Sequence, residues 1–182
     1  VLAAIASKVL MKVFYGARVA RPDLLRAITY LSQFLTKWTP ECDRRLHRLM
    51  CYLKGTLKHK LVGWVGDSTN DIRPHLFSDA DFAGCQTTNK STTGVYLSLE
   101  GPNTCFPIST ISKKQSCVSY STPEAELVAG AFALRQVGCP AMTLWQCLAG
   151  SVYDTPADNQ KLTNAEQLPY CLYFHGDNSA MV

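Results

Sequence analysis

The chain has 182 residues, of which 47% are hydrophobic and 18% charged, a composition typical of a globular protein and unlike that of a disordered one. It contains no low-complexity tract and no run of about 18 consecutive apolar residues, so the sequence predicts no membrane span. The net charge of +4 combines +9 over residues 1–60 with −5 over residues 61–182. This asymmetry favours a polyanion-binding face beside an acidic metal-binding site, although two ordinary solvated surfaces would carry the same charges.

The eight cysteines are spread along the chain and form no C-x-x-C pair, so the sequence gives no support to a zinc site. Such a spread is typical of reduced thiols in an intracellular protein, and we expect most of them to be buried.

The first forty residues predict two helices. Residues 1–15 contain no helix breaker, and residues 16–21 are expected to form a connector. From Pro22, which suits a first helical position, apolar residues recur at helical spacing until Pro40 ends the helix.

A third helix is predicted over residues 41–54, with Gly55 as its C-cap. Arg44, Arg45 and Arg48 lie largely off its apolar face. These arginines either contact nucleic-acid phosphates or are only solvated, and the sequence favours neither.

From residue 60 onward the pattern becomes that of strands. Residues 61–65, 75–81, 92–99 and 104–110 are strand candidates, and the last three have tight links, so we expect an antiparallel meander. Pro107 suggests an edge or irregular position for the last of these strands.

A basic polar link over residues 112–116 precedes two predicted helices, 124–137 and 139–149. Ser121 fits the N-cap of the first helix, with Glu124 at the third helical position. Glu126 begins a face of small residues, which would let the helix lie close to a sheet.

Residues 150–169 form a polar loop in this interpretation, and residues 170–175 form a last strand. Because this strand is apolar throughout, we expect it to be buried on both faces and parallel to the strand over residues 75–81.

Acidic side chains follow both of these strands. Asp79 and Asp81 project from one face of the first, Asp177 follows the second, and Glu126 lies on the helix between them. Three converging carboxylates would suit two Mg²⁺ ions roughly 3.5–4 Å apart, which can hydrolyse a phosphodiester without a nucleophilic side chain. Alternatively, Asp79 and Asp81 are turn residues that cap a strand end.

Five motifs occur in an order that resembles the ribonuclease H domain of copia-type retrotransposon Pol polyproteins, and two upstream motifs resemble the end of the reverse transcriptase and its connection to that domain. The five are Phe77–Gly84, Lys90–Gly94, Ser112–Ser116, Thr122–Leu127 and Gly176–Ala180, and the two are Ala20–Leu24 and Tyr52–Thr56.

The resemblance implies an α/β fold, a ribonuclease H-like mixed sheet with flanking helices after a small helical segment. It divides the chain into a connection segment, 1–58, and a ribonuclease H-like domain, 59–182. It implies two-metal hydrolysis of the RNA strand of an RNA–DNA hybrid, with Mg²⁺ or Mn²⁺. The remainder of the reverse transcriptase would be the protein partner, in a cytoplasmic virus-like particle or in the nucleus.

Carried over residue by residue, the resemblance makes Asp79, Glu126 and Asp177 the catalytic, metal-binding carboxylates, with Asp81 as a weaker candidate. Lys113 and Lys114 would contact hybrid phosphates, as Arg44, Arg45 and Arg48 could, and such contacts position a substrate without reading its sequence.

The chain departs from the family in ending before a fourth carboxylate and the closing elements, so we expect a C-terminally truncated domain. Pro123 also stands where the family has Ser or Thr. A catalytically inactive retroelement fragment that serves as a structural or nucleic-acid-binding module is therefore the alternative, and another nuclease or an integrase of the same fold is a weaker one.

Overall fold

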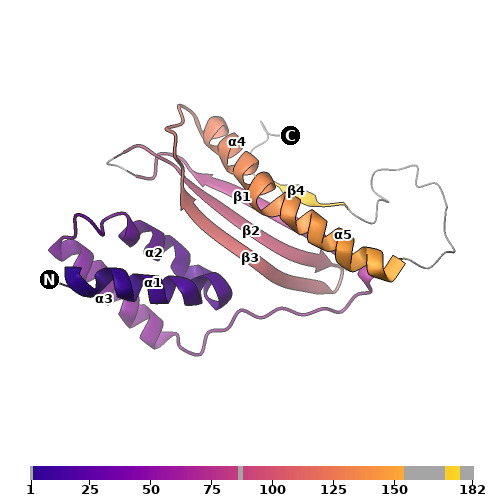
Figure 1. The fold of residues 1–182 in the computed structure, drawn as a ribbon, viewed down its shortest axis with the longest axis horizontal. Helices are drawn as coiled ribbons and strands as arrows, with labels where there is room; N and C mark the ends of the chain where they lie inside the picture. The colour runs from indigo at the N-terminus through magenta and orange to yellow at the C-terminus, as the bar shows by residue number, and fades with distance from the viewer. Residues whose placement is uncertain (1, 86–87, 154–170, 177–182) are drawn as a thin grey trace. The chain divides into compact units, whose positions relative to one another are not determined.

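The computed structural model of the chain describes residues 2–85, 88–153 and 171–176 (Figure 1). The chain forms two compact units, Val1–Leu61 with Thr110–Lys114, and Val62–Ser109 with Gln115–Val182.

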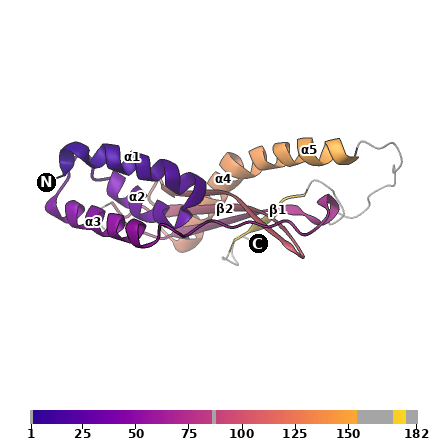
Figure 2. The same cartoon turned by 90° about the horizontal axis from the view of Figure 1, so that it is seen from below.

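The first unit contains three α-helices that pack on one another: α1 (Ala3–Ala20), α2 (Leu25–Ser32) and α3 (Pro40–Gly55), with a short 3₁₀ helix, η1 (Pro22–Leu24), before α2 (Figures 1 and 2). Their apolar faces bury a common core that includes Leu10, Leu24, Ile28, Leu31, Leu46 and Leu49. The predicted helical unit is confirmed.

Three details of this unit differ from the sequence prediction. Helix α1 continues through the predicted connector to Ala20, because Gly16 lies in open space and a single glycine does not break a helix. Helix α2 ends at Ser32, earlier than predicted. Pro40 begins α3 at a first-turn position, where its missing N–H costs nothing, and Thr39 Oγ1 caps the helix by accepting a hydrogen bond from Cys42 N at 3.4 Å.

The second unit is built on a four-stranded sheet in the order β3-β2-β1-β4, formed by β1 (Arg73–Asp81), β2 (Thr92–Gly101), β3 (Thr104–Lys114) and β4 (Tyr173–His175). Strand β1 pairs with β2 antiparallel and with β4 parallel, so the sheet is mixed. The two-residue link between β2 and β3 can join only antiparallel strands, which confirms the meander.

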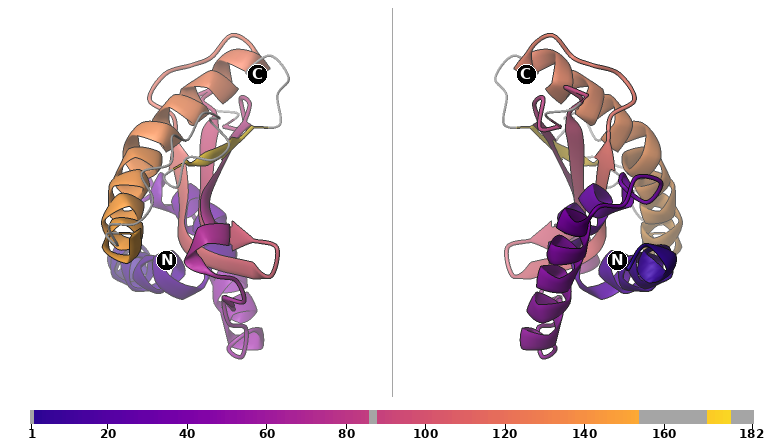
Figure 3. Two further views of the ribbon diagram at one scale, coloured as in Figure 1. Left: turned by 90° about the vertical axis from the view of Figure 1, so that its right-hand side faces the viewer. Right: turned by 90° about the vertical axis from the view of Figure 1, so that its left-hand side faces the viewer.

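A helical layer covers one face of this sheet (Figure 3). It runs from α4 (Thr122–Ala133) through a π-helical turn, η3 (Leu134–Gly138), into α5 (Cys139–Tyr153). Ala125, Ala129 and Ala133 on α4 are fully buried, and Ala125 and Ala129 pack with Ala80 of β1. The predicted close approach of a small-residue face is therefore confirmed, and α/β architecture with a mixed sheet and flanking helices follows.

Several strand and loop predictions are wrong. Residues 61–65 form no strand, because Trp64 makes only an isolated bridge to Cys105. Ser112, Lys113 and Lys114 belong to β3 instead of a polar link. The predicted loop over 150–169 begins too early, since residues 150–153 complete α5, and residues 154–170 lie outside the described part of the chain.

Two burial predictions are also wrong. Strand β4 is not buried on both faces, because Tyr173 is exposed and Phe174 and His175 are half-buried at the end of the sheet order. The eight cysteines are free, as expected, but only Cys42 is buried.

The stretch Thr122–Leu148, which includes the π-helical turn, is long and apolar enough to cross a membrane, judged by length and composition only. One such helix is weak evidence for a span, whereas the sequence predicts none. In the structure this stretch packs its alanines on the sheet.

Thr104 fixes the loop before β1 to the start of β3. Its buried Oγ1 accepts hydrogen bonds from Gly66 N and Asp67 N, both at 3.1 Å. We expect Thr104→Val to lower the free energy of unfolding by about 1–3 kcal/mol, because both donors lose their acceptor. Urea denaturation checks this, with Thr92→Val on β2 as the matched control; equal losses in both variants would contradict it.

His75 of β1 and His175 of β4 lie side by side on the face of the sheet that carries Phe77. His75 Nδ1 lies 2.9 Å from His175 Nε2 and 3.5 Å from Glu100 Oε2. Burial lowers the pKa of His75 below its ordinary value, Glu100 opposes that shift, and His175 adds to it. The folded chain therefore binds fewer protons at this site than the unfolded chain.

We expect this difference to make stability fall as the pH drops through the ordinary histidine pKa, from about pH 7.5 to about pH 5.5. Thermal unfolding across this range is the measurement. His75→Gln should flatten the fall, while His59→Gln, an exposed histidine of the first unit, should leave it unchanged. An identical pH profile for His75→Gln and the parent chain would refute the assignment.

Candidate active site

Strand β1 separates an apolar face from an acidic one at its C-terminal end. Strand alternation buries Leu76, Ser78 and Ala80 toward the helical layer, while Asp79 is exposed and Asp81 half-buried on the opposite face. The prediction that Asp79 and Asp81 share one face is confirmed.

A tight turn follows Asp81. Ala83 adopts a left-handed conformation with φ of 51°, and its N–H donates to Ser91 Oγ at 3.2 Å. The Asp81 carboxylate lies so close to Gly84 that a Cβ at that position would clash with it. Asp81 therefore has the turn role that the sequence left open, whereas Asp79 projects away from the helical layer.

Helix α4 begins as its sequence predicts. Ser121 Oγ accepts a hydrogen bond from Glu124 N at 3.3 Å, and Glu124 Oε2 accepts one from Tyr120 N at 2.7 Å. This reciprocal cap holds the first turn and leaves Glu124 exposed.

Glu126 lies on the opposite side of the same turn and is only 3% exposed. Its Oε1 accepts a hydrogen bond from Ala80 N at 3.1 Å. The helix thus brings a buried carboxylate to the backbone of β1 at the residue between Asp79 and Asp81. The prediction that Glu124 caps the helix while Glu126 faces the sheet is confirmed.

Glu126 can reach this amide because the parallel pairing of β1 is short. Among the described residues, β4 pairs with His75, Leu76 and Phe77, and the last of these pairs is Phe77 with His175. Asp79 follows Phe77 by two residues and Asp177 follows His175 by two residues. Asp177 itself lies outside the described residues.

Two of the three predicted catalytic carboxylates are therefore described: Asp79 on β1, and Glu126 on α4, which accepts a hydrogen bond from the backbone of Ala80, the residue after Asp79. Within residues 2–85, 88–153 and 171–176, no three His, Cys, Asp or Glu side chains are grouped closely enough to hold a metal ion. The donors themselves, carboxylate oxygens on a strand and a helix, suit a hard divalent cation in kind.

Gln115, which no sequence pattern singled out, fastens α4 to the sheet. This side chain is 7% exposed, and its Nε2 donates to Thr93 Oγ1 at 3.1 Å and to Ala125 O at 3.0 Å. Its own N–H donates to Ser91 O at 2.9 Å. A glutamine within a polar stretch gives no sequence signal of burial, so only its contacts identify it as the support of Glu126.

The basic candidates lie in the first unit. Lys113 and Lys114 end β3, and Lys114 Nζ donates to Gln33 Oε1 at 2.9 Å. Arg44 and Arg45 both pair with Glu41, at 2.5 Å and 3.0 Å, and Arg48 is exposed on the same helix.

Comparison with known proteins finds relatives among transposon polyproteins. Over 106 residues, or 58% of this chain, the sequence is 41% identical to the retrovirus-related Pol polyprotein from transposon RE1 and 40% identical to that from transposon RE2, both of Arabidopsis thaliana. It is also 34% identical over 117 residues, or 64% of the chain, to secreted RxLR effector protein 161 of Plasmopara viticola.

The extent of these matches differs. The aligned region spans 7% of each of the two polyproteins but 78% of the effector protein. No protein-family model and no solved structure matches the chain.

The acceptor role of Glu126 can be separated from its charge. We expect Glu126→Ala to destabilise the fold by about 1–3 kcal/mol, because the buried Ala80 N–H loses its acceptor. Glu126→Gln keeps a carbonyl oxygen of the same reach and should lose less. Chemical denaturation checks this; equal losses in the two variants would assign the effect to the lost charge instead.

Proposed function

The chain belongs to a family that includes secreted RxLR effector protein 161 and the Pol polyproteins of copia-type retrotransposons, and from this premise we propose that it carries a ribonuclease H-type site that hydrolyses the RNA strand of an RNA–DNA hybrid. The proposal makes it part of a larger Pol polyprotein, or a protein derived from one.

The observation that carries this proposal is the position of Glu126. A buried glutamate that bonds the amide between two aspartates brings carboxylates from a helix and a strand to one end of β1. Burying a carboxylate is costly unless hydrogen bonds or a cation compensate it, so its burial at this point of the fold favours a functional role.

In this proposal Asp79, Glu126 and Asp177 hold two Mg²⁺ or Mn²⁺ ions. The ions would supply an activated water and stabilise the leaving oxygen. The protein side chains would bind and orient the substrate and the ions. Asp79 faces the substrate from the exposed end of β1. Gln115 and the Ser121 cap keep Glu126 in place.

In this proposal the basic residues bind the substrate. Lys113 and Lys114 would contact hybrid phosphates, as would Arg44, Arg45 and Arg48, which positions the hybrid without reading its sequence. Ribose 2′-hydroxyls would mark the strand to be cut. The proposed site of action is a cytoplasmic virus-like particle or the nucleus.

A second candidate function, a non-catalytic structural or nucleic-acid-binding module, is favoured by one observation. The chain aligns with 78% of an effector protein, so this sequence type also occurs outside polyproteins. In this case the carboxylates would be retained without supporting hydrolysis.

Cleavage of a labelled RNA–DNA hybrid in Mg²⁺ or Mn²⁺ separates the two functions. We expect Asp79→Asn to lower the rate by about 100-fold or more, since it removes a charged group that acts on the reacting phosphate. Asp71→Asn is the matched control, because Asp71 is an exposed aspartate just before β1.

Hybrid that is bound but not cut, in either metal and regardless of Asp79→Asn, would support the binding module and contradict the nuclease. Cleavage that survives Asp79→Asn would contradict the proposed site.

A further inference from the structure

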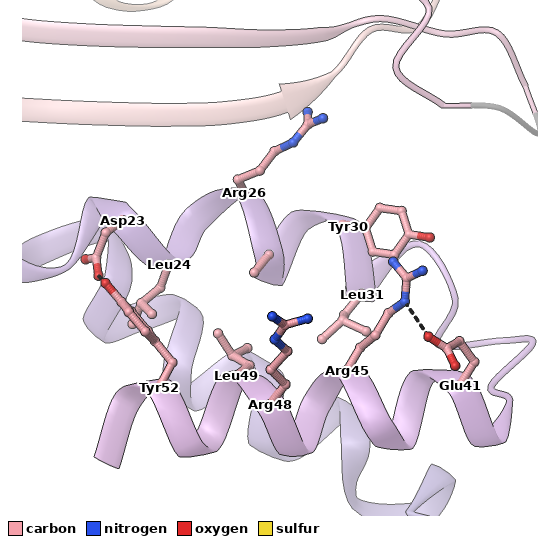
Figure 4. Close-up of a pocket in the computed structure, with 11 residues that line it drawn as sticks. Asp23, Leu24, Arg26, Tyr30, Leu31, Glu41, Arg45, Arg48, Leu49 and Tyr52 are labelled. Atoms are coloured by element: carbon pink, nitrogen blue, oxygen red, sulfur yellow. Dashed lines mark hydrogen bonds and ion pairs between the residues drawn. The ribbon is translucent and has the colours of Figure 1, made fainter. Parts of the chain in front are cut away.

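Helices α2 and α3 line an open pocket of about 700 Å³ within the first unit, which we call the α2–α3 pocket (Figure 4). Its floor is apolar and includes Leu24, Leu31 and Leu49, whose side chains also belong to the core of the unit. A pocket of this volume is of the size that holds a small organic group.

At each end of the pocket an acidic side chain forms an ion pair with an arginine. At one end Arg45 pairs with Glu41 at 3.0 Å and lies over the Tyr30 ring, 4.8 Å from its centroid. At the other end Arg21 pairs with Asp23 at 2.8 Å. Hydrogen bonds from Arg44 and Arg45 lower the pKa of Glu41, and a hydrogen bond from Arg21 lowers the pKa of Asp23, so both acids stay ionised and their charge is matched.

Arg48 lies between these two clusters and supplies the unmatched charge. Figure 4 shows its guanidinium in the space between the helices, beside Leu31 and Leu49. Among the described residues Arg48 makes no hydrogen bond or ion pair. A guanidinium can bind a phosphate through two parallel hydrogen bonds, so Arg48 is available to an anionic ligand.

Tyr52 follows Arg48 by one helical turn and offers an aromatic surface. Its ring is held in place, because its hydroxyl donates to Asp23 Oδ2 at 3.0 Å and the Arg21 guanidinium lies 5.8 Å from the ring centroid. Tyr52 nevertheless remains 46% exposed. A fixed ring of this kind can stack on a planar group at little entropic cost.

We propose that the α2–α3 pocket binds one unstacked nucleotide of a single-stranded nucleic acid, with its phosphate on Arg48 and its base against Tyr52 above the leucine floor. Single-strand sites combine a cationic group with an aromatic side chain on which a base stacks, and both are present here. An acidic peptide would satisfy Arg48 but would not use the fixed ring. The site is separate from the carboxylates of the second unit and does not depend on hydrolysis.

Binding of a short fluorescent oligothymidylate to the full chain tests this proposal. We expect Arg48→Gln to raise the Kd about tenfold, because the variant loses the phosphate contact that also holds the base against Tyr52. Lys54→Gln is the matched control, since it removes one charge from the same helix outside the pocket. Because Arg48 has no partner in the described chain, its variant should keep the parent thermal unfolding midpoint.

The base contact is tested separately. Tyr52→Phe keeps the ring but loses the hydroxyl bond that holds it, so it should weaken binding by no more than about threefold, whereas Tyr52→Leu should weaken binding about tenfold. An abasic strand of equal length and charge should bind the parent chain about tenfold more weakly than oligothymidylate.

Three results would overturn the proposal. Equal weakening by Arg48→Gln and Lys54→Gln would mean unspecific attraction to a basic helix. Equal affinity for the abasic strand would mean a phosphate site without a base. Displacement of the strand by an oligoglutamate peptide at equal concentration would mean an acidic-peptide site.

Discussion

The hydrogen bond from Ala80 N to Glu126 Oε1 joins the helical layer to the central strand, and the arrangement of the second unit depends on it. It forms only because Ala125, Ala129 and Ala133 let α4 lie close to β1, where Ala80 adds no bulk. A hydrogen bond to a charged group contributes about 1.5–3 kcal/mol, which helps to offset the cost of burying the carboxylate. Gln115, which follows β3, strengthens the same junction because it donates hydrogen bonds to Thr93 of β2 and to Ala125 of α4.

The unequal pairing of β1 makes this bond possible. Antiparallel pairing with β2 continues to Asp81, but parallel pairing with β4 stops at Phe77. One edge of β1 therefore has amides without a strand partner from Ser78 onward within the described sheet, and Glu126 takes one of them. Asp79 and Asp81 project from the face away from α4, and the turn after Asp81 engages that aspartate, which leaves Asp79 as the exposed acid.

Charge is distributed differently in the two units. In the first unit most of the arginines near the α2–α3 pocket are paired with Glu41 or Asp23, so the excess charge of that half of the sequence is partly neutralised. Arg48 is an exception. It lines the pocket together with Tyr52, whose ring is held by Asp23, and these two side chains form the proposed nucleotide site. In the second unit, Asp79 and Asp81 lie at the end of β1, and the buried Glu126 accepts a hydrogen bond from the backbone between them.

Residue patterns alone determined the features that rest on local physics: the three helices of the first unit, the Ser121 cap, the shared face of Asp79 and Asp81, and the parallel last strand. Each follows from hydrophobic periodicity, capping chemistry or strand alternation, which act over a few residues. The tertiary structure decided the rest. Whether residues 61–65 pair as a strand, whether β4 is buried, whether Gln115 is a surface or a core residue, and where Arg48 and Tyr52 meet α2 depend on partners far along the chain. Burial and pairing are properties of contacts between distant segments, and no local pattern encodes them.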